Sequence, residues 1–81
     1  MQIKILGPGC RNCVTLERVT REAVAELGID AEIEKVTDYA AIVGYGVMST
    51  PGLVVDEQVL VSGRVPTRRA VRELLEPLVR S

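Results

Sequence analysis

The order of secondary structure in the amino-terminal half limits what this chain can fold into. An alternating, β-branched stretch at residues 2–6 is stopped by Gly7-Pro8-Gly9, and a second alternating stretch covers residues 31–36. Between them, residues 10–27 carry apolar side chains at helical spacing, and Gly28 is placed to end that helix. A strand, a helix and a strand form a βαβ unit, which requires a parallel strand pair and a right-handed crossover.

The second half of the sequence is expected to add an antiparallel hairpin. Thr37 or Asp38 is placed to cap a short helix that runs to about Val43. Two valine-rich stretches follow at residues 53–55 and 58–61, and a two-residue turn joins them. Strands this close in sequence pair antiparallel, so the sheet as a whole is predicted to be mixed.

A final amphipathic helix is expected to close the chain. Thr67 is placed to cap it, and Pro77 lies inside its apolar pattern, so the helix either kinks there or ends at Glu76. The predicted order is β-α-β-α-β-β-α, which is an α/β fold with a mixed four-stranded sheet and three flanking helices. Because the 81 residues contain no linker and no repeat, we expect one domain over residues 1–81.

Charge and composition exclude several classes of partner. The formal net charge is −1, and acidic and basic residues alternate along the chain, which argues against a nucleic-acid-binding or anionic-membrane surface. No apolar run approaches the roughly 20 residues of a membrane helix, and strand-like sequence from Gln2 onward leaves no room for a signal peptide. We therefore expect a cytoplasmic, monomeric protein.

Two cysteines three residues apart lie where the first strand meets the first helix. A thiol at a helix N-terminus faces unpaired backbone N–H groups and the positive end of the helix dipole, and both favour the thiolate that attacks disulfides. Arg11 adds a positive charge when its side chain turns toward Cys10. We predict that Cys10 is an exposed nucleophile and that Cys13, inside the first turn, is the more buried resolving thiol. Such a pair works through its own reversible disulfide and needs no separate cofactor.

Other uses of the two cysteines remain open. A structural zinc site usually takes four Cys or His ligands, and this chain has two Cys and no His, so only a zinc shared by two chains would fit. Two inert thiols in the core are a second alternative. The strongest rival is a carrier that holds copper, arsenic or another soft ion through two thiolates.

The cysteine pair and a later loop together resemble a known superfamily. The stretch Met48-Ser-Thr-Pro51 precedes the valine-rich hairpin, and with Cys10-x-x-Cys13 and the predicted order of elements it resembles the thioredoxin superfamily. More narrowly, the chain resembles the small archaeal and bacterial thioredoxin-like proteins called redox-active disulfide proteins. The resemblance covers essentially the whole chain, including the stretch Val61-Ser-Gly-Arg-Val-Pro66.

This resemblance implies an activity and a set of site residues. It implies a thiol–disulfide oxidoreductase that acts on protein disulfides and receives electrons from a thioredoxin-reductase-type or other donor. Pro51 would be cis and would pack next to Cys10. Thr50 would offer its backbone N–H and C=O to an extended substrate peptide, as in recognition by β-addition.

The sequence also departs from ordinary thioredoxins. Those proteins carry Trp before the first cysteine and Gly-Pro between the two, whereas this chain has Gly9 and Arg11-Asn12. They also carry a buried acid beneath the cysteines, and we find no clear counterpart in the sequence. Lys4 is the nearest unusual polar residue, and we expect it at a strand edge or with its ammonium reaching the surface.

Two neighbouring families supply alternative functions. Thr50-Pro51 and Ser62-Gly63 fall where glutaredoxins hold glutathione, but Arg64 stands where that family carries an acidic residue. Heavy-metal-associated domains also place Cys-x-x-Cys after their first strand, but they end in a strand. This chain is predicted to end in a helix, and it carries the Thr-Pro loop, so both features favour the thioredoxin topology.

Overall fold

The computed structural model of the chain describes residues 1–9 and 11–80. Its order of elements is the one that the sequence predicts, and the bounds differ by only one or two residues, apart from the end of the last helix, which the sequence left open. The elements are β1 (Gln2–Leu6), α1 (Arg11–Leu27), β2 (Glu32–Val36), α2 (Tyr39–Gly44), β3 (Gly52–Val55), β4 (Gln58–Ser62) and α3 (Arg68–Arg80).

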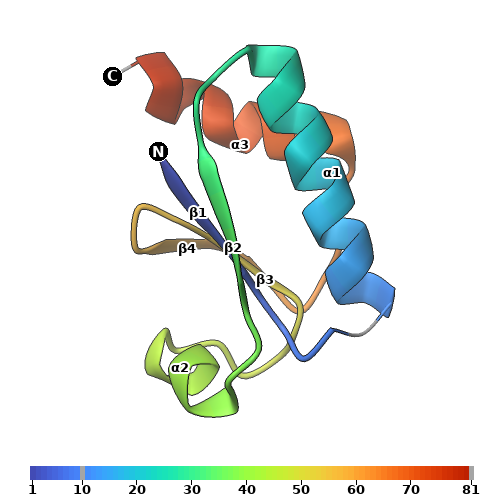
Figure 1. Cartoon of the computed structure of the whole chain (residues 1–81), viewed down its shortest axis with the longest axis vertical. Helices are drawn as coiled ribbons and strands as arrows, with labels where there is room; N and C mark the ends of the chain where they lie inside the picture. Colours follow the sequence, from blue (N-terminus) through green and yellow to red (C-terminus); the bar gives the residue numbers. More distant parts are fainter. Residues whose placement is uncertain (10, 81) are drawn as a thin grey trace.

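The four strands form one mixed sheet in the order β2-β1-β3-β4. β1 runs parallel to β2 and antiparallel to β3, and β3 runs antiparallel to β4. In Figure 1 the long helices α1 and α3 lie side by side, and the short helix α2 lies apart from them. This arrangement confirms the predicted α/β fold class, with its βαβ unit and closing hairpin.

The two faces of the sheet carry separate apolar clusters, because side chains alternate along each strand. Ile3 and Ile5 of β1 belong to the larger cluster, which also takes buried side chains from both long helices. Leu6 points to the other face and packs in a smaller cluster with Ile42 of α2 and Val47. Lys4 also lies on the α2 face. β1 therefore separates the larger core under α1 and α3 from the smaller core under α2.

The helix ends follow the expected capping rules. The Asp38 side chain accepts a hydrogen bond from the Ala40 N–H at 3.2 Å and caps α2. Thr67 Oγ1 accepts from the Ala70 N–H at 3.1 Å and caps α3. Gly28 follows α1 with a φ of +65°, a backbone conformation that glycine adopts without a Cβ penalty.

The last helix does not end at Glu76. α3 continues through Pro77 to Arg80, although proline has no N–H to donate to the carbonyl of Glu73. Glu73 is exposed, so water can satisfy that carbonyl. The interruption falls in the last turns of the helix, where few backbone hydrogen bonds remain to be lost.

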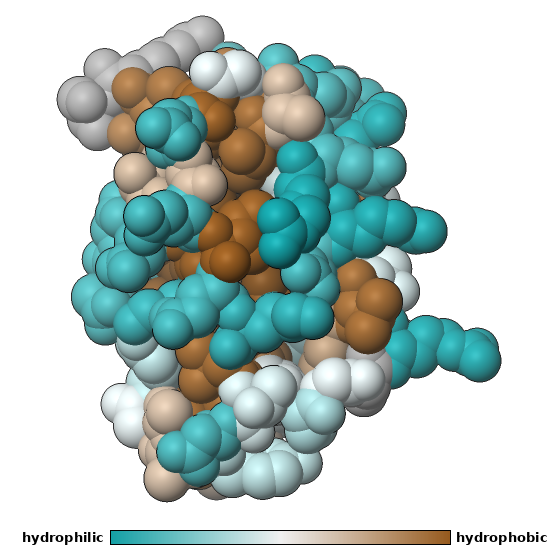
Figure 2. Space-filling model, in the orientation of Figure 1, coloured by the Kyte–Doolittle hydropathy of each residue, from teal (hydrophilic) through white to brown (hydrophobic). Residues whose placement is uncertain are grey.

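The surface mixes polar and apolar side chains. On the face in Figure 2, hydrophilic residues surround apolar side chains that remain visible between them. A chain of 81 residues has too little polar surface to cover its aliphatic core completely. No helix among residues 1–9 and 11–80 is long and apolar enough to cross a membrane.

Candidate active site

The turn between β1 and α1 brings three segments into contact. Gly7 follows β1 directly and is buried, and its N–H donates to the Val36 carbonyl at 2.9 Å. A Cβ atom at this position would collide with Cys13 Sγ and would lie 3.8 Å from Thr50 Cβ. The absence of a side chain at Gly7 therefore lets the start of α1 and the loop before β3 approach the end of β1.

Cys13 lies in the first turn of α1 and is buried, with 5% of its surface exposed. It occupies the helix face that turns toward the sheet, together with Leu16, Thr20 and Ala23. Cys10 lies outside the residues that the structure describes, so its exposed nucleophilic role remains a prediction. Arg11 is the first residue of α1, and its side chain is exposed.

The loop before β3 also lies next to Gly7. The peptide bond between Thr50 and Pro51 is cis. Pro51 is buried, and its carbonyl accepts a hydrogen bond from the Gly63 N–H at 2.8 Å. Thr50 is half-buried and lies beside Gly7. These contacts fix the Thr50–Pro51 pair between the turn after β1 and the end of β4.

A small pocket of about 100 Å³ opens beside Cys13. Its apolar lining includes Ile5 and Val14, whereas Glu17 and Lys35 supply charged groups. Glu17 follows Cys13 by one helical turn, which places both side chains on the same side of α1. The buried thiol therefore shares this pocket with an acidic and a basic side chain.

Ion pairs hold the Glu17 carboxylate at this pocket. Glu17 Oε2 accepts from Arg21 Nη2 at 3.0 Å, and Oε1 lies 3.5 Å from Lys35 Nζ. The hydrogen bond from Arg21 lowers the pKa of Glu17, and the positive charge of Lys35 lowers it further. Only 14% of the Glu17 side chain is exposed, so a carboxylate that is ionised at neutral pH lies largely inside the structure.

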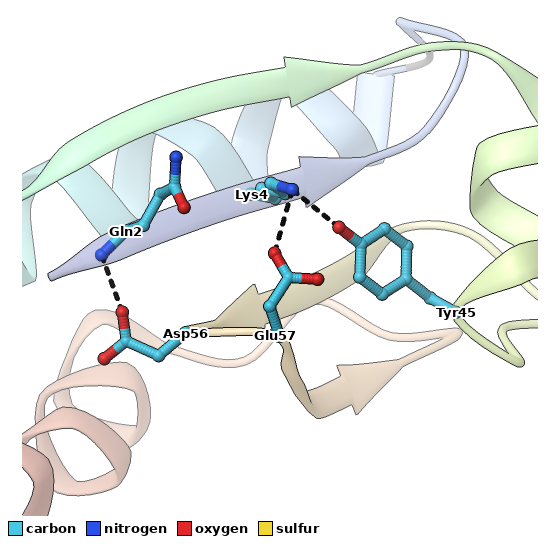
Figure 3. A network of polar contacts seen from close by, with 5 residues as sticks. All are labelled: Gln2, Lys4, Tyr45, Asp56 and Glu57. Atoms are coloured by element: carbon cyan, nitrogen blue, oxygen red, sulfur yellow. Dashed lines mark hydrogen bonds and ion pairs between the residues drawn. The ribbon is translucent and has the colours of Figure 1, made fainter.

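A polar network lies under the same sheet on the α2 face. Lys4 Nζ donates to the Tyr45 hydroxyl at 2.6 Å and to Glu57 Oε1 at 3.0 Å, as Figure 3 shows. The same ammonium lies 5.4 Å from the centre of the Tyr45 ring. The hydrogen bond to Tyr45, followed by the one to Glu57, raises the pKa of Lys4 above its ordinary value.

Of the two positions expected for Lys4, the sheet edge is wrong, because β1 is an inner strand. The side chain is 19% exposed, and its ammonium reaches out to the exposed carboxylate of Glu57. Its ammonium ends on Tyr45 and Glu57. Lys4 therefore joins three segments: β1, the end of α2 and the turn between β3 and β4.

Metal binding has no geometric support in the described part of the chain. Among residues 1–9 and 11–80, no group of three or more His, Cys, Asp or Glu side chains is arranged to hold a metal ion. A two-thiolate site would need Cys10, so the soft-metal alternative remains untested.

Comparison with known proteins identifies the family. A protein family described as thioredoxin domain matches residues 1–76. The chain belongs to the thioredoxin family. A thioredoxin of Methanothermobacter thermautotrophicus is 45% identical over 75 residues, which cover 93% of this chain and 97% of that protein. A thioredoxin of Methanocaldococcus jannaschii is 40% identical over 74 residues, which cover 91% of this chain and 85% of that protein. The predicted superfamily is thus confirmed, and the chain is a thioredoxin-like redox protein.

Three residues in the contacts of this thioredoxin-family protein do not stand out in the sequence. Gly7 looks like part of a turn, and Tyr45 carries no signal of its own. Glu17 precedes Arg21 by four residues, and such an opposite-charge pair is typical of an exposed helix face. Its spacing of four from Cys13 was the available signal, since residues four apart lie on one helix face.

Proposed function

We propose that this chain is a dithiol–disulfide oxidoreductase that reduces protein disulfides with Cys10 and Cys13. The observation that carries the proposal is the burial of Cys13 in the first turn of α1, against Gly7 and beside the Thr50–Pro51 loop. A thiol in that position is shielded from outside reactants but can reach the sulfur of a residue one turn earlier. This is the placement that a resolving thiol requires.

In the first step, the Cys10 thiolate attacks one sulfur of the substrate disulfide. The substrate S–S bond breaks, a new S–S bond joins Cys10 to the substrate, and the other substrate sulfur leaves as a thiolate that takes a proton from water. Cys10 is favoured for this step because it directly precedes α1, where backbone N–H groups and the helix dipole stabilise a thiolate.

In the second step, Cys13 loses its proton to water and attacks the sulfur of Cys10. The mixed disulfide breaks, the Cys10–Cys13 disulfide forms, and the second substrate sulfur leaves as a thiolate. Two electrons have then passed from the protein to the substrate. A thioredoxin-reductase-type enzyme or another dithiol donor returns them in the cytoplasm.

The Thr50–Pro51 loop is proposed to orient the substrate. Thr50 lies beside Gly7 and precedes β3, so its backbone can pair with an extended peptide whose disulfide faces Cys10. Such pairing recognises the main chain of the substrate and not a particular side chain. The proposal therefore assigns protein disulfides in general as the substrate class, and a monomer as the working form.

Trapping with single-cysteine variants tests these roles. We expect Cys13→Ser to accumulate mixed disulfides with a protein substrate, because the first step proceeds and the second cannot. Cys10→Ser should form none, and it serves as the matched control because it removes the other thiol. Non-reducing electrophoresis and whole-protein mass measure the adducts. Adducts on Cys10→Ser alone would reverse the two roles, and glutathione adducts alone would favour the glutaredoxin-like alternative.

A further inference from the structure

The ammonium of Lys4 holds the end of α2 in place. Lys4 projects from the α2 face of β1, and its side chain reaches the Tyr45 hydroxyl at 2.6 Å. Tyr45 is the C-cap residue of α2, and its N–H donates to the Ile42 carbonyl at 3.1 Å. The contact therefore connects an inner strand to the C-cap residue of α2 (Figure 3).

α2 depends on such contacts for its position. The helix has only six residues, which is too short to be stable without tertiary support. Its apolar anchors are Ile42 and the neighbouring Val47, which pack with Leu6 and Val54. Apolar contacts are not directional, whereas a hydrogen bond between Lys4 and Tyr45 fixes one atom against another.

The segment after Tyr45 leads directly to the proposed substrate loop. Gly46 turns the chain with a φ of +80°, and Val47 is buried. Met48 and Ser49 are then exposed, with 90% of the Met48 surface accessible. Thr50 and the buried Pro51 follow. The stretch Met48–Thr50, whose first two residues are exposed, is thus held by Tyr45 and Val47 on one side and by Pro51 on the other.

We propose that Lys4 and Tyr45 are positioning residues. They hold the stretch Met48–Thr50 in the position in which it forms an edge that pairs with protein substrates. The proposal rests on the function assigned above. An extended peptide pairs with this edge along several atoms, so a small displacement of the edge weakens its binding. A small disulfide needs only access to the reactive cysteine, and it is insensitive to the same displacement.

The test compares two tyrosines of the same short segment. Tyr45→Phe removes the hydroxyl that Lys4 contacts and keeps the ring. Tyr39→Phe removes a hydroxyl from a 63% exposed ring at the start of α2, and it is the matched control. Turnover is measured with insulin as a protein disulfide and with hydroxyethyl disulfide as a small one, and dithiothreitol supplies the electrons in both assays.

We expect Tyr45→Phe to raise KM for insulin by up to about fivefold, because the free energy of the one positioning hydrogen bond that is lost sets the upper limit. Its kcat for insulin, and both constants for hydroxyethyl disulfide, should match the parent. Tyr39→Phe should match the parent throughout. Lys4→Met should repeat the effect of Tyr45→Phe, and Lys4→Arg should restore part of the insulin affinity because it keeps a charged donor.

Equal losses on both substrates would overturn the inference, because they indicate a general structural role for the Lys4–Tyr45 contact. Unchanged insulin kinetics in Tyr45→Phe and Lys4→Met would overturn it as well. Thermal unfolding of each variant distinguishes a displaced loop from a loss of folded protein. A parent chain that reduces neither substrate would instead overturn the proposed function, and the inference with it.

Discussion

Gly7 lies directly against the thiol of Cys13, and a side-chain carbon at Gly7 would occupy the space of the Cys13 sulfur. The contact joins the end of β1 to the first turn of α1. It also explains why the strand can pass so close to the helix that carries Cys13. The position of the Cys13 thiol therefore depends on a residue that has no side chain.

Replacing Gly7 by Ala should impair both folding and redox activity. The added methyl group must displace Cys13 or the backbone beside it, and overpacking of this kind costs about 1–3 kcal/mol. The rate of disulfide reduction should fall with it. Gly44→Ala is the control because a Cβ there meets no atom within 4 Å, so it should keep the activity of the parent. Urea unfolding and insulin turnover measure the two effects, and a Gly7→Ala variant with parental activity would contradict the described packing.

The charge of Glu17 should influence the reactivity of Cys13. A carboxylate that shares a pocket with a thiol disfavours the thiolate, so Glu17→Gln should shift the alkylation of Cys13 toward lower pH. Lys35→Gln should shift the alkylation of Cys13 toward higher pH, because it removes a positive charge from the pocket. The measurement is the pH dependence of iodoacetamide labelling in a Cys10→Ser background. Glu22→Gln, an exposed position on α1, is the control. Identical profiles for Glu17→Gln and Glu22→Gln would show that the pocket charge is without effect.

Thr20 should be replaceable by Val with a gain in stability. Thr20 is fully buried, and its hydroxyl has no hydrogen-bond partner among the residues that the structure describes. Replacing an unsatisfied buried hydroxyl by a methyl group removes a desolvation cost of about 1 kcal/mol or more. Thr15→Val, which loses the 2.9 Å bond to the Arg11 carbonyl, is the matched control and should not gain stability. Urea denaturation measures both, and a destabilised Thr20→Val would indicate a hydrogen bond that the structure does not record.

Stability should fall in acid because two ion-paired carboxylates, those of Glu17 and Glu57, become protonated and lose their charge. The hydrogen bond from Arg21 lowers the pKa of Glu17, and the one from Lys4 lowers that of Glu57, relative to an ordinary value of 4.5. A carboxyl with a lowered pKa stabilises the fold at pH values above its ordinary pKa. That contribution is lost as the pH falls through the lower, folded value. Urea midpoints from about pH 7 to about pH 3 should therefore decline below pH 4.5, and less steeply in Glu17→Gln. Glu34→Gln should decline like the parent.

The fold was predictable because local signals agree along most of this chain. Alternation identified β1, helical periodicity followed by Gly28 identified α1, and the two-residue turn identified the β3–β4 hairpin. Pro77 was the exception: the local pattern did not show whether the last helix kinks at Pro77 or ends before it. Each of these elements is specified by neighbours in the sequence.

The site was predictable only in part. Its cysteines and the Thr-Pro loop are visible as motifs, but the contacts around them join residues from different elements. Lys4 and Tyr45 are 41 residues apart, and nothing in either local pattern indicates the other. Glu17 has the local pattern of an exposed helix residue, and its approach to Lys35 of β2 is not contained in that pattern. The contact of Gly7 with Cys13 depends on the distance between β1 and α1, which a sequence pattern does not contain.

A redox titration tests the central claim, which is that Cys10 and Cys13 exchange a disulfide with substrates. The protein is equilibrated in buffers of defined thiol–disulfide ratio, trapped by alkylation and read by whole-protein mass. We predict one reversible, two-electron transition to an intramolecular disulfide, at a potential within the range of about −270 to −120 mV known for thiol–disulfide oxidoreductases. A pair that stays reduced throughout, or that yields only intermolecular or glutathione adducts, would contradict the dithiol mechanism.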